Sequence, residues 1–194
     1  MPFCRRAIYL AFNKPYQVLS QFKELDEKRT LKDFILHQNK PKAVGRLDYD
    51  SEGLLLLSDD DGFIGELTSP KSHIEKEYIV QVEGIPKETD LEKLRNGIRT
   101  NSEIYRPCVA EIIQEPDFLW KRNPPIRVRK TIPDSWLKIV IEEGKNRQVR
   151  KMTAFIGFPA LRLIRVRIGN LKIGNLLPGE YKNLSKKDIL RKHD

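Results

Sequence analysis

The hydrophobic and polar positions along the chain alternate with periods that predict a succession of short strands and helices. Four consecutive leucines between Gly53 and Ser58 have the length and boundaries of a fully buried strand, although periodicity alone also allows a helix. Period-two alternation over KEYIVQVEG (76–84) predicts a strand with Tyr78 and Val80 on one face. Further strands are predicted over residues 7–15, 108–114, 135–144 and 160–170.

Helical spacing marks four other segments. They are residues 30–37, 62–70, 87–98 and 146–158. Thr30 and Asn146 are the predicted N-caps of the first and last helix, and Gly97 is the predicted stop of the third. Hairpin-like and helix-separated strands together predict an α+β fold, in which helices flank a large, mostly antiparallel sheet. The length predicts a single domain over residues 1–194, built as one body or as two lobes around a central cleft.

Charge is distributed unevenly along the chain. The formal net charge is +9, yet residues 121–194 alone hold 19 Lys and Arg against 6 Asp and Glu, so residues 1–120 are mildly acidic. A basic half joined to an acidic half favours an oriented surface for a polyanion, and nucleic acid is the expected partner. A surface whose charge only improves solubility is the alternative.

The segment 115–134 is long and polar, and it is rich in proline and basic residues. Its polarity argues against a buried element, and long loops in compact domains are usually functional. A Pro-Pro pair restricts its backbone and lowers the cost of ordering it on a ligand. We therefore expect a loop that contacts the phosphates of a nucleic acid rather than a solvated connector. Its candidate cations are Lys121, Arg122, Arg127, Arg129 and Lys130.

Several classes of protein and site find no support in the sequence. The longest apolar run is too short to span a membrane and no signal-peptide core is present, so a cytoplasmic protein is expected. Cys4 and Cys108 form no CxxC pair and are expected to be reduced thiols. The histidines form no metal-binding pair, and SDDDG (58–62) lacks the alternation of a calcium loop, which favours a helix-capping turn. No glycine-rich nucleotide motif occurs, so neither a metal nor a nucleotide cofactor is expected.

Asp48 is the main candidate for chemistry. It lies two residues after Arg46 and shortly before the buried leucine strand, so we expect it on a loop that leaves the core. A carboxylate in such a place serves as a nucleophile when a nearby cation keeps it ionised. The pattern alone leaves open an ordinary loop aspartate paired with Arg46.

Four motifs carry a resemblance to a known family. GRLDYDSEGLLLLSDDDG (45–62) is similar to the GRLDxxSxGLLLLTNDG signature of bacterial ribosomal RNA pseudouridine synthases, of type A for the small ribosomal subunit and types B, E and F for the large one. KEYIVQVEG resembles the family's K-x-Y motif, EEGKNRQVRKM (142–152) its third motif, and RIGN…LPGEY its C-terminal signature. The resemblance runs from about residue 8 to about residue 184. Segment 120–139 is most similar to the type E branch of the family.

Membership of this family implies its catalytic fold, here without the S4 RNA-binding domain that most relatives carry. It also implies an isomerase without a cofactor, which converts a specific uridine of 23S ribosomal RNA into pseudouridine. A cytoplasmic monomer is expected. The alternative is a catalytically silent factor on the same fold, which binds rRNA or assists ribosome assembly. Binding alone would not need the aspartate.

The resemblance also assigns roles to individual residues. Asp48 matches the catalytic aspartate, which attacks either the sugar C1′ or the uracil C6, and Arg46 matches the arginine that helps to extrude the target base. Tyr78 matches the tyrosine that stacks on the flipped uracil. The alternative is that Tyr78 is simply a core residue of its strand. The third motif carries a basic residue that pairs with the aspartate, and we place it at Arg150. The alternatives for that position, which are also expected to bind RNA, are Lys145 and Arg147.

Overall fold

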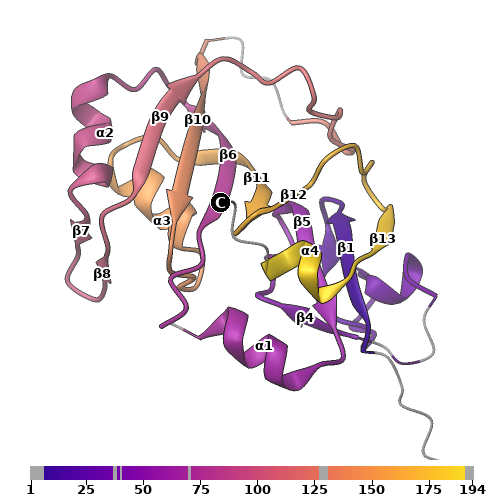
Figure 1. Ribbon diagram of the computed structural model, residues 1–194. Helices are drawn as coiled ribbons and strands as arrows, with labels where there is room; N and C mark the ends of the chain where they lie inside the picture. The colour runs from indigo at the N-terminus through magenta and orange to yellow at the C-terminus, as the bar shows by residue number, and fades with distance from the viewer. Residues whose placement is uncertain (1–6, 37–38, 40, 70, 127–130, 191–194) are drawn as a thin grey trace, which may run out of the picture. The chain divides into compact units, whose positions relative to one another are not determined.

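The computed structural model describes residues 7–36, 39, 41–69, 71–126 and 131–190 (Figure 1). The chain divides into two compact units. The first unit comprises Met1–Ser72 together with Gly169–Asp194, and the second comprises His73–Ile168. Each unit has strands and helices of its own, and each holds part of the predicted functional residues.

The first unit is built around the predicted leucine strand. This strand is β5 (Glu52–Ser58), and all seven of its residues are buried. It pairs antiparallel with β1 (Tyr9–Lys14) and with β4 (Lys42–Val44), while β1 also pairs antiparallel with β13 (Tyr181–Asn183). Side chains from both faces are fully buried, which explains why the strand is a continuous apolar run instead of an alternating one.

The remaining elements of the first unit are short. They are β2 (Val18–Leu19), β3 (Arg29–Thr30), the 3₁₀ turn η1 (Leu31–Asp33), α1 (Asp61–Thr68), β12 (Leu171–Lys172) and α4 (Lys186–Leu190). The helix predicted over 30–37 is wrong beyond its first turn, although Thr30 caps it as predicted. Phe34 leaves the helical conformation with φ −122° and packs on Phe12 at 5.7 Å between ring centroids. Tertiary packing therefore overrides the helical spacing at this point.

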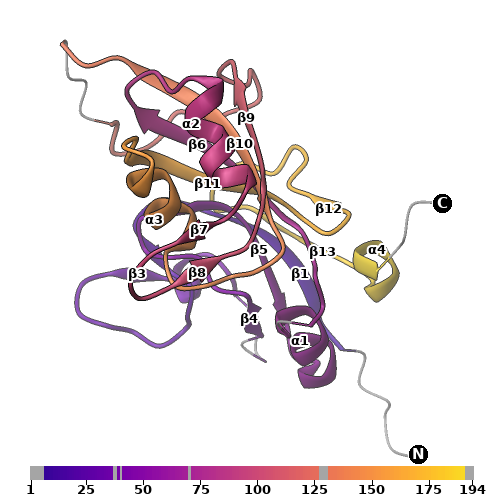
Figure 2. The same cartoon turned by 90° about the vertical axis from the view of Figure 1, so that its left-hand side faces the viewer.

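The second unit is a four-stranded antiparallel arrangement with helices. Its strand order is β11 (Ala160–Ile168), β6 (Lys76–Glu83), β10 (Asp134–Ile141) and β9 (Val109–Ile113). The helix α2 (Glu88–Arg95) contacts β9, and α3 (Gln148–Phe155) contacts β11. The hairpin of β7 (Ile98–Arg99) and β8 (Ile104–Tyr105) follows α2 along the chain (Figure 2). The predicted strands and helices of this unit are confirmed.

Two helix boundaries in the second unit differ in how well the sequence predicted them. Gly97 ends α2 as predicted, with φ +82°, and a Cβ there would lie 2.8 Å from the carbonyl oxygen of Tyr105. Asn146 as N-cap of α3 is wrong, because the cap is Arg147 in the left-handed region with φ 52°. Instead of an asparagine cap, the Gln148 side chain accepts a hydrogen bond from the Lys145 amide at 3.1 Å.

Antiparallel pairing dominates both units, and the predicted α+β class with a mostly antiparallel sheet is confirmed. The short strands β2 and β3 differ from this pattern, because they pair in parallel. Within the described part of the chain, no helix has the length and apolar character needed to cross a membrane. The central cleft stays a prediction.

Candidate active site

Asp48 lies on a short loop that leads into β5, and we call residues 45–51 the aspartate loop. The Asp48 side chain is half-buried, Arg46 is exposed, and Leu47 between them is buried. Gly45 starts the loop with φ 70°, a conformation that glycine adopts readily. The loop thus buries its leucine as an anchor while the two predicted functional side chains on either side of it keep access to solvent.

Hydrogen bonds fix the backbone on both sides of Asp48. The Ser20 hydroxyl donates to the Leu47 carbonyl at 2.7 Å and accepts from the Leu47 amide at 3.1 Å. The Gln17 amide donates to the Tyr49 carbonyl at 2.9 Å, and the Ser51 amide donates to the Asp48 carbonyl at 3.1 Å. The backbone that carries the Asp48 carboxylate is thus fixed before any ligand arrives, which favours catalysis.

The turn that supplies Gln17 and Ser20 is organised by a buried lysine. Lys14 is 0% exposed, and its ammonium donates to the carbonyl oxygens of Pro15 at 2.9 Å and Val18 at 2.8 Å. Gln17 itself has φ 56°, so the turn depends on a residue in the left-handed region. The aspartate loop therefore rests on a second turn that is itself cross-linked by hydrogen bonds.

Tyr78 and the arginines of β11 lie in the second unit. Tyr78 is 7% exposed on β6, where it is opposite Ile139 of β10 and Arg165 of β11. Arg165 is only 2% exposed. Burial lowers the pKa of Lys76, two residues before Tyr78, and the positive charge of Arg165 lowers it further. A buried arginine thus lies opposite the predicted stacking tyrosine, and a half-buried lysine lies two residues before it.

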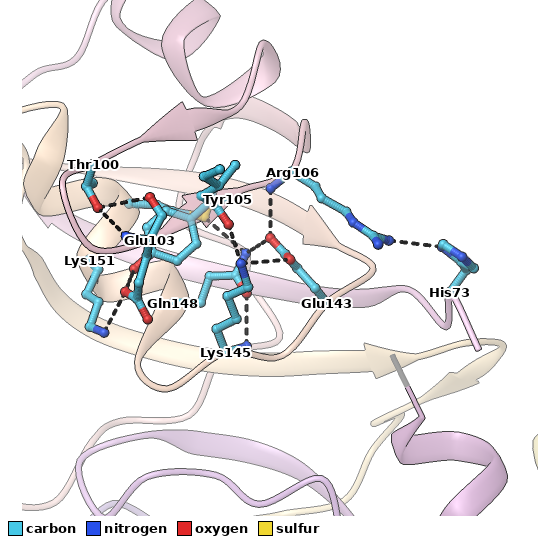
Figure 3. Close-up of polar contacts among 11 residues, drawn as sticks. His73, Thr100, Glu103, Tyr105, Arg106, Glu143, Lys145, Gln148 and Lys151 are labelled. Carbon is cyan, nitrogen blue, oxygen red and sulfur yellow. Dashed lines mark hydrogen bonds and ion pairs between the residues drawn. The ribbon is translucent and has the colours of Figure 1, made fainter. Parts of the chain in front are cut away.

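The basic residues of the third motif differ in their surroundings. Arg150, on α3, is half-buried and donates through Nη1 to the Ala160 carbonyl at 3.2 Å. Arg147 is exposed. Lys145 donates to the carbonyl of Ile104 and lies 5.5 Å from the centre of the Tyr105 ring. Figure 3 shows Lys145 together with Tyr105 and Glu143. Lys145 therefore joins the third motif to the β7–β8 hairpin.

Carboxylates complete this connection between hairpin and motif (Figure 3). Glu143 accepts from the Gln148 side chain at 2.7 Å and from the Arg106 amide at 2.8 Å. Glu103 accepts from Lys151 at 2.8 Å and from the Tyr105 hydroxyl, and these two bonds, Lys151 first, lower the pKa of Glu103. Burial, followed by the bond to Glu103, raises the pKa of Tyr105 to about 12. The hairpin and the start of α3 thus form one hydrogen-bonded body.

The long basic loop is described only in part. Lys121 is exposed, and Arg122 is half-buried and donates to the Pro124 carbonyl at 2.9 Å. The start of this loop is held by Arg162, which is 5% exposed, donates to the Trp120 carbonyl at 3.0 Å and lies 5.7 Å from its ring centre. The predicted phosphate contacts that lie outside the described residues are Arg127, Arg129 and Lys130.

The acidic cluster after β5 has a structural role, as predicted. Asp60 is the N-cap of α1 and accepts from the Phe63 amide at 3.0 Å and from the Tyr9 hydroxyl at 2.7 Å. Asp59 accepts from the Ile8 amide at 2.6 Å, and Asp61 pairs with Lys42 at 2.7 Å. Among the described residues no group of three His, Cys, Asp or Glu side chains is placed to hold a metal ion.

Comparison with known proteins identifies the family. The family model of RNA pseudouridylate synthases matches residues 8–155. The chain belongs to the RNA pseudouridylate synthase family. Ribosomal large subunit pseudouridine synthase E of Vibrio vulnificus is 51% identical over 176 residues, which cover 91% of this chain and 74% of that protein. The protein of the same name from Xanthomonas axonopodis pv. citri is 49% identical over 168 residues, covering 86% and 88%.

A solved structure supports the same synthase fold. It is described as the crystal structure of a pseudouridylate synthase, and it has a TM-score of 0.77 and 29% identity to this chain. The match covers 96% of this chain and 74% of that one. The resemblance carried by the four motifs, including that to the type E branch, is thereby confirmed.

The predicted site residues of this synthase fall into two groups. Arg46 and Asp48 share the aspartate loop of the first unit, whereas Tyr78 and the third-motif cations belong to the second unit. Their individual roles stay predictions. Sequence reasoning missed Ser20, because a serine 27 positions before Leu47 gives no periodic or motif signal.

Proposed function

We propose that this protein isomerises one uridine of 23S ribosomal RNA to pseudouridine, as a cytoplasmic monomer. The proposal rests on membership of the synthase family and on the name of its relatives, ribosomal large subunit pseudouridine synthase E. The observation that carries it is the half-buried Asp48 on a loop fixed by hydrogen bonds at Leu47 and Tyr49. Fixing the backbone that carries a nucleophile lowers the cost of placing it against its substrate.

The reaction exchanges one bond of the nucleotide for another. The N1–C1′ glycosidic bond breaks, the uracil rotates, and C5 joins C1′; the proton lost from C5 is balanced by the proton gained at N1. Asp48 supplies the nucleophile, and its carboxylate attacks either C1′ of the sugar or C6 of the uracil. No electron is gained or lost overall, so the chemistry requires no redox cofactor.

The other predicted residues prepare the uridine for this step. The exposed Arg46 fills the space that the extruded base leaves, which offsets part of an unstacking cost of a few kcal/mol. Tyr78 stacks on the uracil, a contact worth about 1–3 kcal/mol. Arg150 keeps Asp48 ionised, since its guanidinium has a permanent charge and fits a carboxylate.

The test is chemical mapping of pseudouridine in 23S rRNA from a strain that lacks the enzyme. Purified wild-type protein should convert one uridine, and the Asp48→Asn variant should bind the same RNA with little or no conversion. Binding is retained because the basic residues that hold RNA phosphates are unchanged. Conversion by the Asn variant at more than a trace rate would remove Asp48 as nucleophile, and binding without conversion by the wild type would favour the silent rRNA-binding factor.

A further inference from the structure

A groove on the second unit is formed mostly by residues that the proposed reaction does not use. Its volume is about 520 Å³, and residues 99–104 of the β7–β8 hairpin line it together with Lys145 of the third motif. We call it the hairpin groove. It is large enough for several groups of an extended ligand, since one phosphate ion occupies a small fraction of this space.

The lining of the hairpin groove is preformed. At the tip of the hairpin, the Thr100 hydroxyl donates to the Glu103 carbonyl at 3.0 Å and accepts from the Glu103 amide at 2.9 Å. The backbone adds a hydrogen bond from the Thr100 amide to the same carbonyl at 2.8 Å. Lys145, the lining residue from the third motif, is held by the Ile104 carbonyl and the Tyr105 ring. A ligand that enters the groove therefore has little protein to order.

The charge of the groove is positive. Glu103 is the one carboxylate among the lining residues, and Lys151 pairs with it at 2.8 Å. Lys145 adds a positive charge, although it also lies 3.7 Å from Glu143. Arg99 is exposed, and among the described residues no hydrogen bond or ion pair engages its guanidinium. The lining of the groove thus contains an arginine whose guanidinium has no protein partner among the described residues. Its one carboxylate is paired with a lysine.

We infer that the hairpin groove binds the sugar–phosphate backbone of the substrate RNA, with Arg99 as the contact to a phosphate. A guanidinium matches a phosphodiester through two parallel hydrogen bonds. The exposed side chains of Asn101 and Ser102 supply neutral donors and acceptors of the kind that contact phosphate oxygens and ribose hydroxyls. The inference rests on the proposed function, because it takes the ligand to be the RNA that the enzyme modifies.

The hairpin groove is linked through hydrogen bonds to the part of the third motif that carries Arg150. Lys145 and Lys151, which join the hairpin to the third motif, lie on either side of Arg150 in the sequence. RNA bound along the hairpin is therefore attached to the same hydrogen-bonded body that carries the predicted partner of Asp48. Backbone contacts of this kind set the register of a nucleic acid without reading its sequence.

The test compares the full-length wild type with Arg99→Gln in binding an rRNA fragment that contains the substrate uridine, across a series of salt concentrations. Loss of one phosphate contact should reduce the slope of log affinity against log salt by about 0.9 on a duplex or 0.7 on a single strand. At about 0.1 M salt this corresponds to an affinity roughly five- to eightfold lower.

The matched control is Lys93→Gln, which removes an exposed charge on α2 of the same unit outside the groove. It should leave the salt slope unchanged. Arg99→Glu should weaken binding further than Arg99→Gln, and circular dichroism checks that both variants are folded. Identical affinity and slope for Arg99→Gln and wild type would overturn the inference, as would an equal loss in Lys93→Gln. Because binding is measured without turnover, a failure of the proposed reaction would show separately as absent pseudouridine.

Discussion

The Ser20 hydroxyl satisfies both backbone groups of Leu47, the residue before Asp48. Ser20→Ala removes both bonds inside a buried site, and each buried group left without a partner costs about 1–3 kcal/mol. We expect lower thermal stability together with a fall in kcat of roughly tenfold or more, since small displacements of a nucleophile are costly. RNA affinity should remain unchanged. Single-turnover kinetics and a binding titration measure the two quantities separately.

Ser58 provides the matched control for this prediction. Its hydroxyl also bridges two backbone groups, donating to the Ile8 carbonyl at 2.7 Å and accepting from the Asp60 amide at 3.1 Å, at the other end of β5. Ser58→Ala should lower stability by a similar amount while kcat is preserved. Equal losses of kcat in both variants would mean that Ser20 acts through stability alone and does not position Asp48.

The three basic candidates of the third motif make different contacts and so lead to different expectations. Arg150→Met removes the cation that we propose keeps Asp48 ionised, and it should lower kcat by about 100-fold or more. Arg147→Met should change kcat little and weaken RNA binding. Lys145→Met should lower the melting temperature, because Lys145 holds the Ile104 carbonyl, and should also weaken RNA binding, because Lys145 lines the hairpin groove. A kcat loss confined to Arg147→Met or Lys145→Met would move the predicted pairing to that residue.

At the scale of elements, β1 and α1 are linked by the hydrogen bond from Tyr9 to Asp60. This bond, followed by burial, raises the pKa of Tyr9 from 10.0 to about 12. The folded state therefore holds this proton more tightly than the unfolded state. The stabilisation is complete below pH 10 and is lost as the pH rises towards 12.

Tyr9→Phe should thus be less stable than the wild type up to pH 10, and the difference should shrink between pH 10 and 12. Thermal melts across this range measure it. Tyr105 titrates in the same range, and taking the difference between variant and wild type cancels its contribution. Tyr181→Phe is the control, because that hydroxyl donates to no carboxylate within the described residues. A constant difference between Tyr9→Phe and wild type would contradict the assignment.

The elements that the sequence predicted well are those whose length lets periodicity show. β5, β6, β10 and β11 each have seven to nine residues, and their hydrophobic patterns were sufficient to predict them as strands. Strands of two residues, such as β2 and β7, carry no period and depend on partners brought together by the fold. The start of α3 was misplaced because a left-handed Arg147 is set by the surrounding contacts of Lys145 and Gln148, which no cap rule anticipates.

At the scale of the whole molecule, motif resemblance predicted the functional residues. It did not predict the residues that hold them in place. Asp48 and Arg150 stand in long motifs that can be recognised by eye. Ser20 and the hairpin groove depend on contacts between residues about 27 and 41 positions apart, such as Ser20 with Leu47 and Lys145 with Ile104. Such distant contacts become visible only once the chain is folded.

Isomerisation of uridine needs neither a redox change nor a Lewis acid, and the sequence offers no ligand pair among its histidines. We therefore expect turnover to survive EDTA, provided that monovalent salt maintains the RNA fold. The measurement is pseudouridine formation with dialysed enzyme in the presence and absence of chelator. An activity that EDTA abolishes and that one particular transition metal alone restores would contradict this expectation.

The contact between Arg162 and Trp120 gives the basic loop an optical signal of its own. The protein has two tryptophans, and the other, Trp136, is buried in β10. Trp136→Phe would leave Trp120 as the single strong fluorophore, with a guanidinium 5.7 Å from its ring. Its emission would then follow the loop through each stage of RNA encounter in real time, without an added dye. A stopped-flow trace would in this way record arrival of the RNA separately from pseudouridine formation.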